Sequence, residues 1–167
     1  SDPIPNVEFK IFTEKDELIY SGKTDENGKI VIKELAVGKY YIVEENPIEG
    51  YVSSDEKVLF EIKENGEVVK AEMTNKKITS TLKVTKNDED ETLLFGIKFG
   101  VYNLEDKLIS EHTTDENGYF EVVLEYGKYY FKEISTLDSY VLNDEKVHFE
   151  VKEEGAVIEK TMTNKFK

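Results

Sequence analysis

A long internal repeat constrains this sequence more than any other feature. The residues Thr24–Gly28 (TDENG) recur as Thr114–Gly118, at an offset of 90. The residues Gly38–Tyr41 (GKYY) recur as Gly127–Tyr130, at an offset of 89, so one deletion between these blocks keeps the repeat in register. Two further blocks keep the second offset: Asp55–Val58 with Asp144–Val147, and Met73–Lys76 with Met162–Lys165. Matches in this order predict two homologous domains in tandem.

The repeat places the domain boundaries at residues 1–77 and 78–167 of the 167-residue chain. The joint Lys76–Thr79 contains no Pro or Gly, so we expect a short connection that does not act as a flexible linker. The chain begins abruptly at Ser1 and is interpreted as a fragment of a longer protein, with export and anchoring signals outside it.

Each repeat has the alternating pattern of β-strands. In the first repeat, apolar Val7, Phe9 and Ile11 alternate with charged residues, which indicates a strand with one buried and one solvated face. Asp-Glu-Asn-Gly supplies a tight turn in both repeats, because Asn and Gly tolerate positive φ. With about seven short strands per repeat, the sequence predicts an all-β chain of two β-sandwiches, immunoglobulin-like or transthyretin-like.

The composition excludes several functions. A net charge of −14 repels phosphate backbones and anionic lipid headgroups, which argues against nucleic-acid and membrane partners. The chain has no Cys, so disulfides and thiolate metal sites are excluded, and neither a metal nor a cofactor is implied. His112 and His148 have no counterpart in the first repeat, and no Ser or Thr lies in a nucleophile-elbow motif. We therefore predict that the protein is not an enzyme.

Strand parity turns three polar side chains of the second repeat toward the core. Lys86 shares a strand face with Val84, Glu133 shares one with Phe131, and Asn164 follows an apolar Met by two residues. A buried charge without a partner is costly, so we expect Lys86, Glu133 and Asn164 to pair with one another. From parity alone, a hydrogen-bonded polar cluster is the favoured interpretation.

The order of these motifs resembles a known family. The motifs are Lys86–Asp88, Phe95–Phe99, Gly127–Glu133 and Thr163–Lys165 in the second repeat, and Pro5–Phe9, Gly38–Glu44, Glu49–Tyr51 and Thr74–Lys76 in the first. Each motif is weak alone, but their order and spacing occur twice and cover nearly the whole chain. Together they are similar to the B-type domains of the collagen adhesin (Cna), which occur in surface adhesins and pili of Gram-positive bacteria.

This resemblance implies a covalent reaction inside the second domain. In the family, a Lys and an Asn side chain form a spontaneous intramolecular isopeptide bond with the help of a Glu. Carried over to this chain, Lys86 attacks the side-chain carbonyl of Asn164, Glu133 assists the proton transfers, and ammonia leaves. Burial would favour the neutral, nucleophilic amine and would hold the reacting groups together. Because the reaction occurs once per molecule, it is autocatalysis and not enzyme turnover.

The first repeat departs from this pattern. Glu44 and Asn75 are the equivalents of the assisting Glu and the reacting Asn, but the position equivalent to Lys86 falls before residue 1. Lys10 is a poor substitute, because strand parity turns it outward. We therefore predict that the first domain lacks its first strand and its own bond, with Glu44 idle. Upstream residues of the full protein or a neighbouring chain would fill its open edge.

The resemblance implies a structural function. We expect stalk or spacer domains of an extracellular, cell-wall-anchored adhesin or of a pilin-like polymer, in contact with neighbouring domains of the same protein. A host extracellular-matrix ligand would be bound through other domains.

Two other interpretations apply to parts of the sequence. Tyr41 and Tyr130 are predicted to face outward, where they could stack on sugars, so a module that binds carbohydrate or a host protein is the main alternative function. The acidic run Asn87–Glu91 lacks the glycine and the ligand spacing of a calcium loop. A solvated turn is therefore favoured there.

Overall fold

The chain forms two compact units, Ser1–Lys77 (unit 1) and Ile78–Lys167 (unit 2). The computed structural model describes residues 2–46 and 48–167; Ser1 and Pro47 lie outside the described residues. The secondary structure of the described residues consists of β-strands. This part of the chain therefore contains no helix that qualifies as a membrane span. The predicted all-β class, with two tandem sandwich domains, is confirmed.

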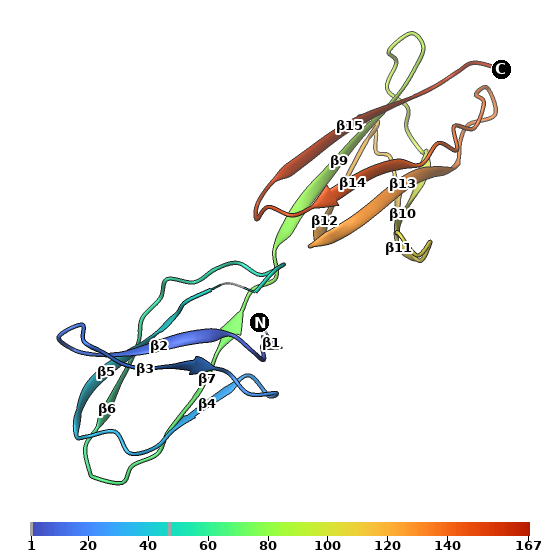
Figure 1. The fold of residues 1–167 in the computed structure, drawn as a ribbon. Coiled ribbons are helices and arrows are strands. Elements are labelled where there is room, and N and C mark those ends of the chain that lie inside the picture. Colours follow the sequence, from blue (N-terminus) through green and yellow to red (C-terminus); the bar gives the residue numbers. More distant parts are fainter. Residues whose placement is uncertain (1, 47) are drawn as a thin grey trace. The chain divides into compact units, whose positions relative to one another are not determined.

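Unit 2 is a sandwich of two sheets (Figure 1). Its strands are β9 (Thr79–Asp88), β10 (Lys98–Asn103), β11 (Leu108–Thr113), β12 (Tyr119–Glu125), β13 (Gly127–Ser135), β14 (Val147–Val151) and β15 (Val157–Asn164). One sheet has the order β11-β10-β13-β14, and the other has the order β12-β9-β15. In the second sheet, β9 is antiparallel to β12 and parallel to β15. The first and last strands of unit 2 therefore lie side by side.

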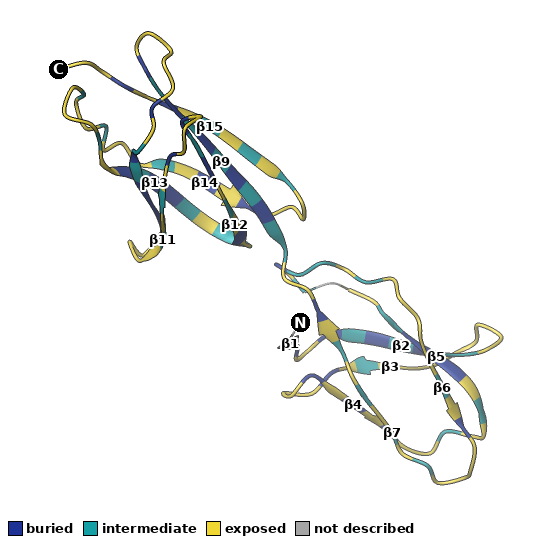
Figure 2. Ribbon diagram, turned by 180° about the vertical axis from the view of Figure 1, so that it is seen from behind, coloured by how far each residue is buried: buried dark blue, intermediate teal, exposed yellow. Residues whose placement is uncertain are grey.

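The core of unit 2 lies between these two sheets. Every second residue of β9 is buried and the residues between are half-buried, as Figure 2 shows along the strand. From the facing sheet, Phe99 and Phe131 are fully buried, with ring centroids 5.9 Å apart. Buried aromatic rings supply a large share of the apolar area that stabilises a domain of this size. The alternation explains why a polar residue of β9 on the Leu82 and Val84 face must enter the core.

Unit 1 repeats the four-stranded sheet, with the order β3-β2-β5-β6. Its strands are β1 (Asp2–Pro3), β2 (Glu8–Thr13), β3 (Leu18–Lys23), β4 (Lys29–Ile32), β5 (Gly38–Glu44), β6 (Val58–Ile62), β7 (Val69–Glu72) and β8 (Thr74–Asn75). Phe9, Ile11 and Ile42 of this sheet pack with Ile30 and Ile32 of β4 in a buried cluster. The remaining strands form two pairs, β4 with β7 and β1 with β8.

The units differ at one strand position. By the repeat, β4 and β7 correspond to β12 and β15, which flank β9 in unit 2. In unit 1, β4 and β7 instead pair directly and antiparallel, from Lys29 opposite Glu72 to Ile32 opposite Val69. Among the described residues, unit 1 has no counterpart of β9, so the two strands close over that position.

The backbone of Met73 takes the position that Lys86 has in unit 2. The Met73 amide donates to the carbonyl of Gly28 at 3.1 Å, whereas the Lys86 amide donates to the carbonyl of Gly118 at 2.6 Å. Gly28 and Gly118 are repeat equivalents. In unit 1, the residue that follows β7 therefore makes the backbone hydrogen bond that β9 makes in unit 2.

Candidate functional site

Lys86, Glu133 and Asn164 meet in the core of unit 2. Their exposed fractions are 0%, 2% and 0%. Lys86 Nζ donates to Asn164 Oδ1 at 2.6 Å and lies 3.7 Å from Glu133 Oε1. Asn164 Nδ2 donates to Glu133 Oε1 at 2.6 Å. The amine, the carboxylate and the amide thus contact one another in one buried site, and these are the groups that a nucleophile, a proton carrier and an acyl donor require.

The strands position these three groups from opposite sheets. The alternation of β9 turns Lys86 inward, and the parallel ladder with β15 pairs Lys86 with Met162, two residues before Asn164. Glu133 lies on β13 in the facing sheet and pairs with Phe99 of β10. The Asn-Gly turn permits the close approach of β9: Gly118 has a φ of 70°, and a Cβ there would lie 2.7 Å from the Lys86 carbonyl oxygen. The predicted turn residue therefore helps to place the lysine strand.

Burial changes the chemistry of the lysine. It lowers the pKa of Lys86 from 10.5 to about 8, although the charge and the hydrogen bonding of Glu133 act in the opposite direction. At pH 7 this shift raises the neutral fraction of the amine from about one in three thousand to about one in ten. Only the neutral amine is a nucleophile, so burial favours the form of Lys86 that has the chemistry to attack a carboxamide.

Two further residues hold the site and were not predicted from the sequence. Thr136 Oγ1 accepts a hydrogen bond from Asn164 Nδ2 at 2.8 Å. The backbone amide of Asn143 donates to Glu133 Oε2 at 2.7 Å. With Nδ2 held by Thr136 and Glu133, the Asn164 carbonyl oxygen is left facing Lys86. Both residues follow β13 in irregular segments, where strand parity does not apply.

In unit 1, Glu44 and Asn75 meet in the same way. Asn75 is 5% exposed, and its Nδ2 donates to Glu44 Oε1 at 2.9 Å. Glu44 Oε2 is buried and has no hydrogen-bond partner. No described lysine donates a hydrogen bond to Glu44 Oε2. Unit 1 therefore holds the carboxylate and the amide without an amine.

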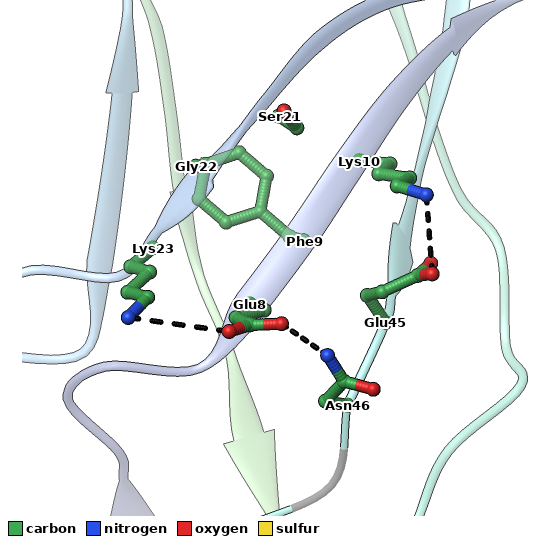
Figure 3. Close-up of a pocket in the computed structure, with 8 residues that line it drawn as sticks. All are labelled: Glu8, Phe9, Lys10, Ser21, Gly22, Lys23, Glu45 and Asn46. Carbon is green, nitrogen blue, oxygen red and sulfur yellow. Dashed lines mark hydrogen bonds and ion pairs between the residues drawn. The ribbon is translucent and has the colours of Figure 1, made fainter.

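Lys10 lies on the outer face of unit 1, in a shallow hollow of about 390 Å³ (Figure 3). Its ammonium pairs with Glu45 Oε1 at 3.1 Å. In the same hollow, Glu8 lies 3.9 Å from the Lys23 ammonium and accepts a hydrogen bond from Asn46. Because these polar groups pair with one another, they form a surface network in which the partner of Lys10 is Glu45.

The tyrosines predicted to face outward are covered by their neighbours, so the expectation that they offer exposed rings for a sugar is wrong. Tyr41 is 9% exposed and Tyr130 is 3% exposed. The Tyr41 ring stacks on Phe12 at 5.2 Å, and the Lys57 ammonium lies 4.6 Å from its centroid. Its hydroxyl donates to Asp16 at 2.5 Å. A sugar needs an open ring face, and this ring already has Phe12 stacked on it and the Lys57 ammonium over it.

Tyr130 has the same environment in unit 2. Its ring stacks on Tyr102 at 5.0 Å, the Lys146 ammonium lies 4.9 Å from its centroid, and its hydroxyl donates to Asp106 at 2.8 Å. The repetition of this arrangement in both units shows that it belongs to the fold. Strand parity could not show it, because a side chain on the outer face can still be covered by its neighbours.

The acidic run Asn87–Glu91 forms a turn around Asp88. Asp88 Oδ1 accepts hydrogen bonds from the backbone amides of Asp90 and Thr92, at 2.9 and 3.0 Å. Asp88 Oδ2 accepts the Tyr140 hydroxyl at 2.8 Å. Both carboxylate oxygens of Asp88 are therefore occupied by hydrogen bonds within the protein. No group of three His, Cys, Asp or Glu that could hold a metal ion occurs in the part of the chain that the structure describes.

The fold and the site together define a β-sandwich domain, present twice, with a buried amine, carboxylate and amide in its second copy. The sequence profile of the SpaA prealbumin-like fold domain matches residues 1–77 and again residues 80–166. The chain belongs to this family. The predicted pair of tandem adhesin- and pilin-type domains is thereby confirmed.

Solved structures show the same fold. The Bacillus anthracis TIE protein is 40% identical, with a TM-score of 0.85, over 97% of this chain, which spans 31% of that protein. GBS52, the minor pilin of Streptococcus agalactiae, is 19% identical with a TM-score of 0.51, over 99% of this chain and 85% of that one. BcpA*(D312A), the major pilin subunit of Bacillus cereus, is 13% identical with a TM-score of 0.50, over 98% and 95%. A search among curated proteins found no match.

Proposed function

We propose that the chain forms two structural stalk domains, residues 1–77 and 78–167, of an extracellular surface protein of a Gram-positive bacterium. Membership of the SpaA prealbumin-like family and the fold shared with two pilins support this role. The chain spans 31% of the TIE protein, so its partners would be neighbouring domains of the same protein. Export and cell-wall anchoring would be functions of segments outside this chain.

The buried cluster of Lys86, Glu133 and Asn164 carries the proposal. The neutral Lys86 amine attacks the Asn164 side-chain carbonyl carbon, and Glu133 takes a proton from the amine nitrogen. Glu133 then delivers that proton to Asn164 Nδ2, the bond from this nitrogen to the carbonyl carbon breaks, and ammonia leaves. The contacts of 2.6 Å on either side of the amide supply the proximity that amide formation needs.

The bond would stabilise unit 2 and carry load. Lys86 and Asn164 are 78 positions apart in the sequence, and a cross-link over a loop of that size is worth roughly 4–5 kcal/mol in the chain-entropy estimate. That is comparable with the whole stability of a small domain. A pulling force that enters along β9 would pass through the bond to the end of β15, so residues 87–163 would lie outside the loaded path.

Intact mass spectrometry of the purified chain tests this proposal. We expect a mass lower than the calculated value by one ammonia, and a cross-linked peptide containing Lys86 and Asn164 after proteolysis. Glu133→Ala should restore the full calculated mass. The matched control is Glu44→Ala, which removes the equivalent carboxylate of unit 1 and should keep the loss of one ammonia.

An unchanged mass in the native chain would overturn the covalent mechanism. The same conclusion would follow if Glu133→Ala still lost one ammonia. A second control, Lys83→Arg, changes the half-buried lysine on the opposite side of β9 and should keep the bond, whereas Lys86→Arg should abolish it.

The same cluster reacts once per molecule, so we propose no enzymatic turnover. A carbohydrate-binding role is not favoured, because Lys57 and Lys146 cover the tyrosine rings on which it was based.

A further inference from the structure

An irregular segment of unit 2, residues 136–143 (the strap), follows β13 directly. It contains a turn in which the Tyr140 amide donates to the Leu137 carbonyl at 3.1 Å. Thr136, Tyr140 and Asn143 are half-buried, and the other residues of the strap are exposed. The strap therefore turns these three residues toward the domain and leaves the rest in water.

Two of the half-buried residues contact the reactive cluster. Thr136 Oγ1 accepts from Asn164 Nδ2 at 2.8 Å, and the Asn143 amide donates to Glu133 Oε2 at 2.7 Å. The side chain of Asn143 also donates to the Thr163 carbonyl at 3.1 Å. Because the strap holds one oxygen of Glu133, the other oxygen is the one that faces the reacting amide and amine.

Tyr140, the third half-buried residue, fastens the strap to the lysine strand. Its hydroxyl donates to Asp88 Oδ2 at 2.8 Å. Asp88 is the last residue of β9, is 4% exposed, and lies two positions after Lys86. The Tyr140 ring stacks on Phe166 with centroids 5.4 Å apart, and the two residues form a backbone bridge. Tyr140 therefore joins the strap to the ends of both strands that carry the reacting side chains.

Unit 1 shows the equivalent segment without the aspartate. Tyr51 is the repeat equivalent of Tyr140, but the position equivalent to Asp88 falls before residue 1. The segment after Glu44 has the same length up to this tyrosine, yet Glu44 Oε2 is buried without a hydrogen-bond partner. In unit 2 the equivalent oxygen receives the strap amide. The unit that lacks the aspartate therefore also lacks the contact between this segment and the carboxylate.

We propose that the hydrogen bond of Tyr140 to Asp88 is a clasp that holds the strap on the reactive cluster, so that the Asn143 amide orients Glu133 for proton transfer; this inference rests on the function proposed for unit 2. Tyr140 and Asp88 act through Asn143 and are positioning residues. A carboxylate with one oxygen fixed by an amide keeps its other oxygen between the two nitrogens that exchange the proton. Without the clasp, the strap opens more often and water replaces the amide at Glu133.

Tyr140→Phe tests the inference, because it removes the hydroxyl and keeps the ring that stacks on Phe166. Chain prepared unfolded by chemical synthesis is folded by dilution, and the loss of ammonia is followed by mass. We expect the variant to react about tenfold more slowly than the native chain, the factor that corresponds to one hydrogen bond. Tyr129→Phe is the matched control in the same unit: it removes a hydroxyl that donates to the Glu125 carbonyl and should react at the native rate.

Hydrogen exchange of the Asn143 amide separates positioning from general stability. It is measured in Lys86→Met chains, in which no bond can form. We expect Tyr140→Phe to speed the exchange of the Asn143 amide and to leave the exchange of amides in the ladder of β10 with β13 unchanged, because only the strap is released.

The outcomes distinguish this inference from the proposed function. If the native chain loses one ammonia and Tyr140→Phe reacts at the native rate, the reaction of unit 2 stands and the clasp is wrong. Slower reaction with unchanged exchange at Asn143, with faster exchange throughout β13, or with equal slowing in Tyr129→Phe would also overturn the clasp. A native chain that keeps its full calculated mass overturns both proposals.

Discussion

Units 1 and 2 have the same turns and the same four-stranded sheet, but they close their second sheet in different ways. In unit 2, β9 lies between β12 and β15 and brings Lys86 to Glu133 and Asn164. In unit 1, β4 and β7 meet directly, and the Glu44 carboxylate keeps an oxygen without a partner. In these two units, the presence of β9 therefore decides whether the buried cluster holds all three groups or only the carboxylate and the amide.

The comparison also shows what the strand does for stability. Both units bury an apolar cluster, and both clamp a tyrosine between an aromatic ring and a lysine. Unit 2 joins its first and last strands by a parallel ladder of eight residue pairs, whereas the first and last described strands of unit 1, β1 and β8, form only two antiparallel pairs. A covalent bond between the first and last strands of unit 2 would make it the more resistant of the two units.

The largest expected effect is on the thermal stability of unit 2. Lys86→Met removes the amine but keeps an unbranched side chain, so the bond cannot form. We expect the unfolding transition of unit 2 to fall by about 15–40 °C and that of unit 1 to stay unchanged. Differential scanning calorimetry measures both transitions. Lys83→Met is the control, and an unchanged upper transition in Lys86→Met would contradict the role of the bond.

The rate of bond formation should depend on pH, because burial lowers the pKa of Lys86 to about 8. Below this pKa the neutral amine decreases about tenfold per pH unit, and above it the rate should level off. Chain prepared unfolded by chemical synthesis can be folded by dilution between pH 6 and 9, with the loss of ammonia followed by mass. A rate that does not change over this range would show that amine deprotonation does not limit the reaction.

Thr136 should have a smaller effect on the same rate. Thr136→Val removes the acceptor that holds Asn164 Nδ2, and the loss of one hydrogen bond corresponds to roughly a tenfold lower rate at most. Thr136→Ser keeps the hydroxyl and should react at the native rate. The melting temperatures of both variants, measured in the Lys86→Met background where no bond can form, show whether either substitution affects folding and not the reaction. Equal rates for Val and Ser would contradict the positioning role.

The smallest expected effect is the loss of stability when the lysine over each tyrosine ring is removed, and this loss should be equal in the two units. Lys57→Ala and Lys146→Ala each remove an ammonium from a tyrosine ring, at a cost of about 0.5–1 kcal/mol. Urea unfolding in the Lys86→Met background compares the two without the bond. A cost confined to one unit would show that the two clamps are not equivalent.

Much of the candidate site could be predicted from the sequence, because a strand has a period of two residues. The alternation of Leu82, Val84 and Lys86 predicted an inward lysine, and the repeat aligned Glu44 with Glu133 and Asn75 with Asn164. Periodicity failed for Tyr41 and Tyr130. It indicates the face of the sheet on which a ring lies, but not whether Phe12, Lys57 or their equivalents cover that face.

The sequence by itself determined the class of fold, the two copies, and the strand positions that carry the amine, the carboxylate and the amide. These features follow from local periodicity and from a repeat that can be read along the chain. Only the tertiary structure showed that Thr136 and the Asn143 amide hold the site, and that Met73 occupies the backbone position of the absent lysine. Such contacts join segments that are distant in sequence or irregular in conformation, and their partners are chosen by the packing of the two sheets.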